Sequence, residues 1–329
     1  MVSEGGQLEI RDTDIGHLNS KRQVEYNPAM PCRSHKRNGL ILLMLTLAAC
    51  SSPAYANIPP APTATPVTRT LALTATASAT ATLTATATLA PSITSTPAQS
   101  TCREHKGGII SDQLDSDTLG YPIEMQIYLP PCYEDREWES YPVLYLLHGL
   151  EMNEKTWSEI GAGETADSLI AGGDAPPLII VMPRERRDPR FGDALVNDIL
   201  PYVDSHYRTL ADRDHRALGG MSRGAGWALH IGLQNPGLFG ALGLHSLGIF
   251  YADETKVSGW LDKLPPDLRP RFYLDVGDND SLVVSADWLD RALARRDIAH
   301  DYHLNPGSHT RAYWTEHLPD YLRWYTANW

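Results

Sequence analysis

The sequence predicts an α/β domain: a doubly wound, mostly parallel sheet with helices on both faces, preceded by an antiparallel hairpin. Two observations indicate this class. Short apolar runs without polar alternation recur along residues 102–329, and helical stretches lie between them. Runs of that kind are typical of strands that are covered on both faces. Their alternation with helices is typical of a sheet wound in both directions.

Two strands joined by a polar turn at 115–117 are expected at 107–114 and 121–129, and they form the hairpin. Further strands are expected, in order, at 141–147, 178–182, 216–219, 271–276 and 300–304. Helices are expected at 165–171, 193–206, 224–234 and 285–295, and an aromatic helix begins near 312.

An apolar run at 40–49, LILLMLTLAA, follows a basic cluster and ends at Cys50. About ten residues are too few to span a bilayer of roughly 30 Å. A basic stretch, a short apolar stretch and small residues before a cut are typical of a secretory signal. The ending Leu-Ala-Ala-Cys resembles a bacterial lipoprotein box, in which Cys50 is lipidated and anchors the chain to a membrane. Because 1–29 exceeds what a signal needs, Met30 is the hypothetical true start.

The chain from 51 to 100 consists of Ala, Thr, Pro and Ser with scattered Leu, and Arg69 is its only charged residue. Alanine and threonine bury too little apolar surface to offset the entropy of ordering the backbone. We therefore expect three parts: a leader at 1–49, a lipidated and disordered stalk at 50–101, and one α/β domain at 102–329.

Two of the four cysteines flank the predicted hairpin, Cys102 before it and Cys132 after it. The outer ends of an antiparallel hairpin lie side by side, so a disulfide between them is expected. Export provides an oxidising compartment for it. The alternative is a pair of unrelated thiols.

The overall charge excludes some functions. The chain has 28 basic and 40 acidic residues, a formal net charge of −12, so a general electrostatic grip on nucleic acid is not expected. No C-x-x-C or H-E-x-x-H spacing is present, and neither a metal nor an organic cofactor is expected.

The sharpest motif is GMSRG at 220–224, a G-x-S-x-G pattern. A predicted strand precedes it and a predicted helix follows it, which is the strand–turn–helix setting of a nucleophile elbow. Ser222 is therefore the candidate nucleophile, placed at a helix N-terminus that favours developing negative charge. The alternative is a glycine-rich helix start with a capping serine.

A serine nucleophile needs a base and a carboxylate that orients the base. After the strand at 271–276 comes the loop GDNDS, where Asp280 is the first choice of carboxylate and Asp278 the second. Asp275 lies within the strand, where burial without a partner is costly, and is the least favoured. His309 lies in the turn-rich loop NPGSHT after the last strand and is the candidate base, which completes the order Ser, Asp, His.

The oxyanion hole is expected where the apolar strand at 141–147 runs into His148-Gly149-Leu150. The backbone N–H of Leu150 and that of Arg223, the residue after the nucleophile, are the candidate donors. His148 is expected to orient this loop.

The segments YPVLYLLHGL, LGGMSRGAGWAL, DVGDNDSLV and PGSHTRAYW together resemble the esterase D-like family of α/β-hydrolases, which includes feruloyl esterases. The resemblance covers about 107–325 and implies an α/β-hydrolase fold with little or no lid. It implies Ser222 as nucleophile, Asp280 as carboxylate, His309 as base, and Leu150 and Arg223 as oxyanion donors. His245-Ser246, expected after the next strand, has no family role to transfer.

The function expected is a serine esterase that forms an acyl-enzyme. Its substrates would be envelope or extracellular esters, such as feruloyl or acetyl groups on polysaccharide. One alternative is an acyltransferase with a sugar or lipid acceptor, and another is a non-catalytic exported binding module. The expected location is outside the cytoplasm, lipid-anchored to the cell membrane, and the oligomeric state is left open.

Overall fold

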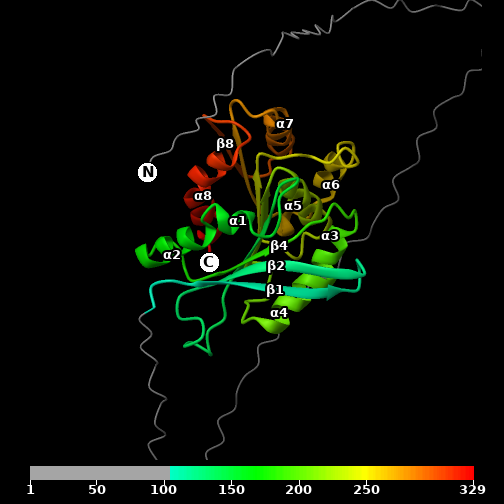
Figure 1. The fold of residues 1–329 in the computed structure, drawn as a ribbon. Helices are drawn as coiled ribbons and strands as arrows, with labels where there is room; N and C mark the ends of the chain where they lie inside the picture. Colours follow the sequence, from blue (N-terminus) through cyan, green and yellow to red (C-terminus); the bar gives the residue numbers. More distant parts are fainter. Residues whose placement is uncertain (1–103) are drawn as a thin grey trace, which may run out of the picture. The chain divides into compact units, whose positions relative to one another are not determined.

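The computed structural model describes residues 104–329, which form an eight-stranded sheet (Figure 1). The strand order is β1-β2-β4-β3-β5-β6-β7-β8. The strands are β1 (Gly108–Ser116), β2 (Tyr121–Leu129), β3 (Val143–Leu147), β4 (Ile179–Pro183), β5 (Arg216–Met221), β6 (Ala241–His245), β7 (Arg271–Gly277) and β8 (His300–Asn305).

The sheet is antiparallel only at its N-terminal end. β1 pairs with β2, and β2 with β4, in antiparallel register, whereas every neighbour from β4 to β8 is parallel. Because parallel strands end at one edge, the loops after β3, β5, β6 and β7 come together there.

Helices cover both faces of the sheet. They are α1 (Thr156–Glu159), α2 (Ala162–Gly172), α3 (Phe191–Ala194), α4 (Leu200–His206), α5 (Arg223–Gln234), α6 (Val257–Lys263), α7 (Val283–Ala294) and α8 (Arg311–Thr326). A π-helical turn (Leu195–Ile199) joins α3 to α4, and a 3₁₀ turn (Pro266–Leu268) precedes β7. Figure 1 shows α1, α2 and α8 on one side of the sheet and α3 to α6 on the other.

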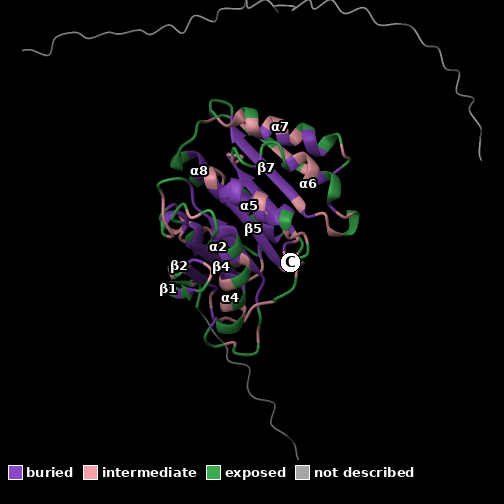
Figure 2. Ribbon diagram, turned by 90° about the vertical axis from the view of Figure 1, so that its right-hand side faces the viewer, coloured by how far each residue is buried: buried purple, intermediate pink, exposed green. Residues whose placement is uncertain are grey.

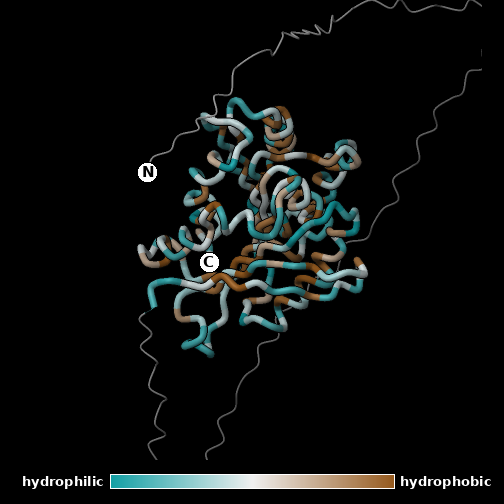
Figure 3. Tube along the Cα trace, in the orientation of Figure 1, coloured by the Kyte–Doolittle hydropathy of each residue, from teal (hydrophilic) through white to brown (hydrophobic). Residues whose placement is uncertain are grey.

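The apolar core is correspondingly divided into two layers by the sheet. One layer holds the buried faces of α3 to α7, and the other holds those of α1, α2 and α8. Strands β3 to β6 are buried along their whole length, as the central band in Figure 2 shows. Figure 3 shows hydrophobic stretches through the centre of the domain, while many of the outer loops are hydrophilic. Uninterrupted apolar sequence runs therefore mark strands with helices on both faces.

The predicted fold class is confirmed, including the N-terminal hairpin and the parallel centre. Some boundaries were wrong. β6 ends at His245, so this residue belongs to the strand and not to a loop after it. The helix expected at 193–206 begins at Phe191 and is interrupted by a π-helical turn at 195–199. Helix α1 has only four residues, too few to show a helical period.

Several predictions fall outside the described residues: the leader with Met30, lipidation at Cys50, the stalk, and the Cys102 end of the disulfide. Within 104–329, the structure contains no helix with the length and apolar character needed to cross a membrane.

Candidate active site

Ser222 lies on the sharp bend between β5 and α5. Its backbone has φ 56° and ψ −116°, a conformation that non-glycine residues rarely adopt. Strain of this kind costs about 1–3 kcal/mol and persists only where surrounding contacts enforce it. The Ser222 N–H donates to the carbonyl of His245 at 2.8 Å, and the Ser222 carbonyl accepts from Gly226 and Gly248, each at 3.2 Å. These contacts hold the side chain away from the sheet.

The glycines around Ser222 are required by close backbone packing. A Cβ on Gly224 would lie 2.2 Å from the Leu147 carbonyl oxygen, and one on Gly220 would lie 2.6 Å from the Gly224 carbonyl carbon. The start of α5 therefore packs directly against the end of β3. This contact brings the loop after β3 next to Ser222: a Cβ on Gly149 would lie 3.6 Å from the Ser222 Cβ.

His309 and Asp280 meet Ser222 at this edge of the sheet. His309 Nε2 lies 2.9 Å from Ser222 Oγ, and His309 Nδ1 lies 2.8 Å from Asp280 Oδ2. The other carboxylate oxygen of Asp280 accepts the Leu282 N–H at 2.8 Å. An N–H donated from Nδ1 to the carboxylate leaves Nε2 free to accept the serine proton. The Asp280 side chain is fully buried, whereas that of His309 is one-third exposed, so the ring is reachable from solvent.

Asp278, the second choice of carboxylate, has a different set of contacts. Its Oδ1 accepts the N–H of Gly307 at 3.0 Å and the side-chain N–H of Asn279 at 2.7 Å. Gly307 is two residues before His309, so Asp278 ties the histidine loop to the end of β7. Asp278 and Asp280 thus contact the same loop at different points, and only Asp280 contacts the ring.

Asp275 is buried. Its place within a strand suggested a carboxylate without partners, but in the structure it has several. Its carboxylate contacts His245 Nδ1 at 2.7 Å and accepts the hydroxyls of Tyr313 at 2.8 Å and Tyr321 at 2.6 Å. Burial, followed by the Asp275 charge, raises the pKa of both tyrosines, which therefore stay protonated and donate.

His245 is held in position by this network of hydrogen bonds. Its Nε2 contacts the Tyr325 hydroxyl at 3.0 Å, and its carbonyl accepts the Ser222 N–H. The buried Asp275–His245 pair therefore supports the strand directly behind the elbow.

The predicted oxyanion residues lie on both sides of Ser222. Arg223 begins α5, and the first N–H groups of a helix have no partner within it. Leu150 follows Gly149 in the loop after β3 and is half exposed. His148 is buried, donates from Nδ1 to the Gly149 carbonyl at 2.8 Å and accepts the Glu185 N–H on Nε2 at 2.9 Å. Burial lowers its pKa, which keeps the ring neutral and able to accept.

Glu185 was not identified from the sequence. It follows β4, its side chain is 4% exposed, and it binds the Arg223 guanidinium through two contacts of 2.7 and 3.2 Å. The only sequence signal is one glutamate within PRERRDPR at 183–190, an arginine-rich run directly after a strand. Nothing in that pattern distinguishes a buried glutamate from a solvated one.

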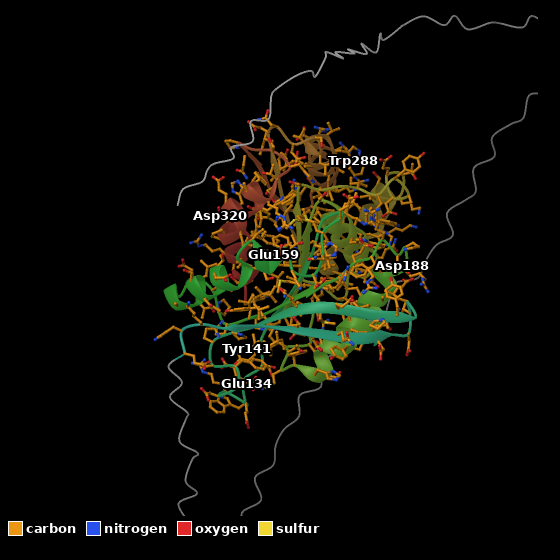
Figure 4. All side chains as sticks on the ribbon, viewed as in Figure 1. Glu134, Tyr141, Glu159, Asp188, Trp288 and Asp320 are labelled. Atoms are coloured by element: carbon orange, nitrogen blue, oxygen red, sulfur yellow. The ribbon has the colours of Figure 1, made fainter. Side chains whose placement is uncertain are left out.

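A cavity of about 260 Å³ is lined by Ile249, Glu254, Val284, Ser285 and Trp288. We name it the cavity beside the elbow because Ile249 lies in the loop that bonds to the Ser222 carbonyl. Ile249 follows Gly248, which bonds to the Ser222 carbonyl, and Val284 follows the Asp280 loop. Figure 4 shows Trp288 on α7, and Glu159 on α1 of the opposite helix layer. Among residues 104–329 no cluster of three His, Cys, Asp or Glu residues is arranged to hold a metal ion.

Curated relatives match part of the chain. An endo-1,4-beta-xylanase/feruloyl esterase of Xylanibacter ruminicola is 35% identical over 157 residues, which are 43% of this chain and 22% of the relative. An esterase of Mycobacterium tuberculosis is 28% identical over 149 residues, 41% of this chain and 31% of the relative. The chain thus spans less than a third of the length of either protein.

Solved structures agree with the fold. A ferulic acid esterase superposes with a TM-score of 0.63 at 25% identity, covering 68% of this chain and 99% of that chain. The S-formylglutathione hydrolase FrmB of Staphylococcus aureus gives 0.59 at 20% identity, covering 68% and 98%.

The sequence profile of the family described as "Putative esterase" matches residues 116–325, well over half of the chain. The match begins at the end of β1, ends within α8, and includes all the site residues described above. The chain therefore belongs to this esterase family of α/β-hydrolases.

Proposed function

We propose that the protein is a serine carboxylic-ester hydrolase in which Ser222 is the nucleophile, His309 the general base and Asp280 the carboxylate that orients the base. The observation that carries this proposal is the continuous chain of contacts Asp280–His309–Ser222 on three separate loops. Esterase-family membership and the feruloyl esterase relatives support ester hydrolysis.

The chemistry follows from this arrangement. The Ser222 oxygen attacks the ester carbonyl while His309 Nε2 takes the hydroxyl proton. Asp280 holds the ring and stabilises the imidazolium that forms. The tetrahedral oxyanion accepts hydrogen bonds from the N–H groups of Leu150 and Arg223. Losing one such donor typically costs about 2.7–4 kcal/mol.

The intermediate then collapses to an acyl-enzyme. The bond to the leaving alkoxide breaks, and His309 returns its proton to that oxygen. A water molecule, deprotonated by His309, attacks the acyl carbonyl and releases the carboxylic acid. Ser222 recovers its proton, and no further reactant is needed.

The cavity beside the elbow supports an acyl group of limited size. Ile249, Val284 and Trp288 give it an apolar wall, and Glu254 supplies an acceptor at its edge. An apolar cavity of about 150 Å³ is enough for benzene, so about 260 Å³ accommodates one ring with a short linker. We propose aromatic acyl esters of the hydroxycinnamoyl kind, including those carried on polysaccharide, as the preferred substrates.

Export, anchoring and the disulfide also remain proposals. Lipidation of Cys50 would tether the enzyme to a membrane outside the cytoplasm. A Cys102–Cys132 disulfide is supported by the position of Cys132, whose Sγ lies 3.8 Å from the carbonyl oxygen of Glu104. Mass analysis of the mature N-terminus tests the first, and thiol titration of the unfolded catalytic domain tests the second. Two reactive thiols without reductant would reject the bridge.

The proposed activity is tested with a panel of acetyl, feruloyl and long-acyl esters, with water and sugar acceptors compared. We expect the free acid as product, fastest release from feruloyl esters, and loss of turnover in Ser222→Ala. Undiminished turnover in that variant would reject the proposal. Acyl transfer to the sugar as the main outcome would replace the hydrolase with a transferase.

A further inference from the structure

We propose that Glu185 is a positioning residue that holds both oxyanion donors in place at once, through its side chain on one side and its backbone on the other. This inference rests on the proposed function. It concerns a residue that does not contact the nucleophile, base or acid by any recorded bond, yet is buried between the two loops that supply the donors.

The side-chain connection runs to Arg223. The Glu185 carboxylate binds Nε and Nη2 of the guanidinium, a two-point contact that fixes both position and orientation. The guanidinium also lies 5.1 Å from the ring centre of Phe250. Arg223 is the first residue of α5, so fixing its side chain restrains the turn whose backbone N–H faces the oxyanion.

The backbone connection runs through His148. The Glu185 N–H donates to His148 Nε2, which leaves Nδ1 as the donor to the Gly149 carbonyl. That carbonyl belongs to the same peptide unit as the N–H of Leu150. In a planar trans peptide the C=O and N–H groups point in opposite directions. A hydrogen bond that fixes the Gly149 carbonyl therefore also fixes the direction of the Leu150 N–H. A hydrogen bond to the carbonyl also polarises the unit and strengthens the N–H as a donor.

Other ion pairs between the same segments are weaker. Arg184 Nε lies 3.8 Å from Glu154 Oε2, at the limit of an ion pair. Arg187 contacts Glu151 at 3.0 Å, but both side chains are more than half exposed. Exposed pairs of this kind contribute little and hold loops loosely. Glu185, in contrast, is shielded from solvent, and its ion pair is charge-assisted at short distance.

The test is Glu185→Gln in the full chain, which keeps the backbone N–H and the side-chain volume but removes the charge from the guanidinium contact. A misplacement of about 1 Å can cost roughly 10²-fold in rate, so we expect kcat to fall by about 10- to 100-fold. KM for the same ester should change by less than about twofold. The rate of Ser222 labelling by a phosphonate, whose phosphoryl oxygen occupies the oxyanion position, should fall in parallel.

Arg223→Gln provides a second route if Glu185→Gln does not fold, because it keeps the Arg223 backbone N–H and removes the other half of the ion pair. We expect the same fall in kcat from it. The double variant should lose little more than either single variant, since both remove one interaction.

Asp204→Asn is the matched control. Asp204 contacts the buried Arg216 at 2.7 Å, a second carboxylate–arginine pair, at the opposite end of β5 from the elbow. It should lower the melting temperature without lowering kcat of the folded protein.

Two results would overturn the inference. One is a Glu185→Gln enzyme with unchanged kcat. The other is a loss of activity that is fully explained by a smaller fraction of folded protein, as expected for the Asp204→Asn control. If Ser222→Ala abolishes turnover while Glu185→Gln leaves it intact, only this inference fails. If Ser222→Ala retains turnover, the proposed function itself fails.

Discussion

The ring of His309 and the carboxylate of Asp280 are 29 residues apart in the chain and 2.8 Å apart in the fold. β7 and β8 are parallel neighbours, so the loops that follow them lie together, and Asp278 bonds the backbone of one loop to the other. The two aspartates thus hold the histidine loop from two directions, and of the two only Asp280 contacts the His309 ring.

Asp280→Asn should therefore lower kcat by roughly 10³- to 10⁴-fold, because an amide favours the wrong tautomer of the histidine. Asp278→Asn keeps an acceptor for the Gly307 N–H, and we expect less than about a tenfold loss. Steady-state kinetics on one ester compare the two variants directly. The reverse ranking would make Asp278 the carboxylate.

Gly224→Ala should destabilise the protein by at least about 2 kcal/mol, since the added methyl meets the Leu147 carbonyl at 2.2 Å and backbone cannot move aside cheaply. Gly172→Ala is the control. It lies at the end of α2 with nothing within 4 Å of a Cβ and should be neutral or stabilise by up to about 1 kcal/mol. Urea unfolding measures both, and equal stability of the two variants would contradict the close packing.

The stability of the protein should fall as pH drops below about 6.5, with His148 as one contributor. Burial lowers its pKa in the folded state, so the unfolded chain binds more protons in this range. The stabilisation from His148 is fully present at pH values above the pKa of this histidine in the unfolded chain. It is lost as the pH falls toward the lower pKa that His148 has in the folded protein. His148→Gln should flatten this part of the profile in urea unfolding from pH 5 to 8. A variant with the same slope as wild type would show that His148 does not contribute.

Trp288→Ala should raise KM for feruloyl esters by about tenfold or more, because it removes one aromatic wall of the cavity beside the elbow. If the acyl group binds in this cavity, an acetyl group is too short to fill it, so kcat and KM for acetyl esters should stay within about twofold. Equal effects on both substrates would show that the cavity does not bind the acyl group.

The sequence predicted those features that depend on a local residue pattern or on the order of motifs along the chain. Apolar runs identified β3, β4, β5 and β7, although no range was predicted for β6, and GMSRG between a strand and a helix identified the elbow at Ser222. The order of motifs was enough to select Asp280 and His309, which the fold brings into contact.

The partners of Glu185 and Asp275 could not be predicted in this way. Whether an acidic side chain is buried and paired depends on partners from distant elements. Arg223 lies 38 residues from Glu185, and Tyr321 lies 46 residues from Asp275. Short elements such as α1 were missed because four residues carry no measurable period.

Covalent labelling with a serine-directed phosphonate, followed by peptide mapping of the wild-type, His309→Ala and Asp280→Asn proteins, tests directly whether these three residues act together. We expect one modified residue, Ser222, and labelling slowed by orders of magnitude in both variants. Modification of another serine, or labelling of Ser222 at the wild-type rate without His309, would contradict this expectation.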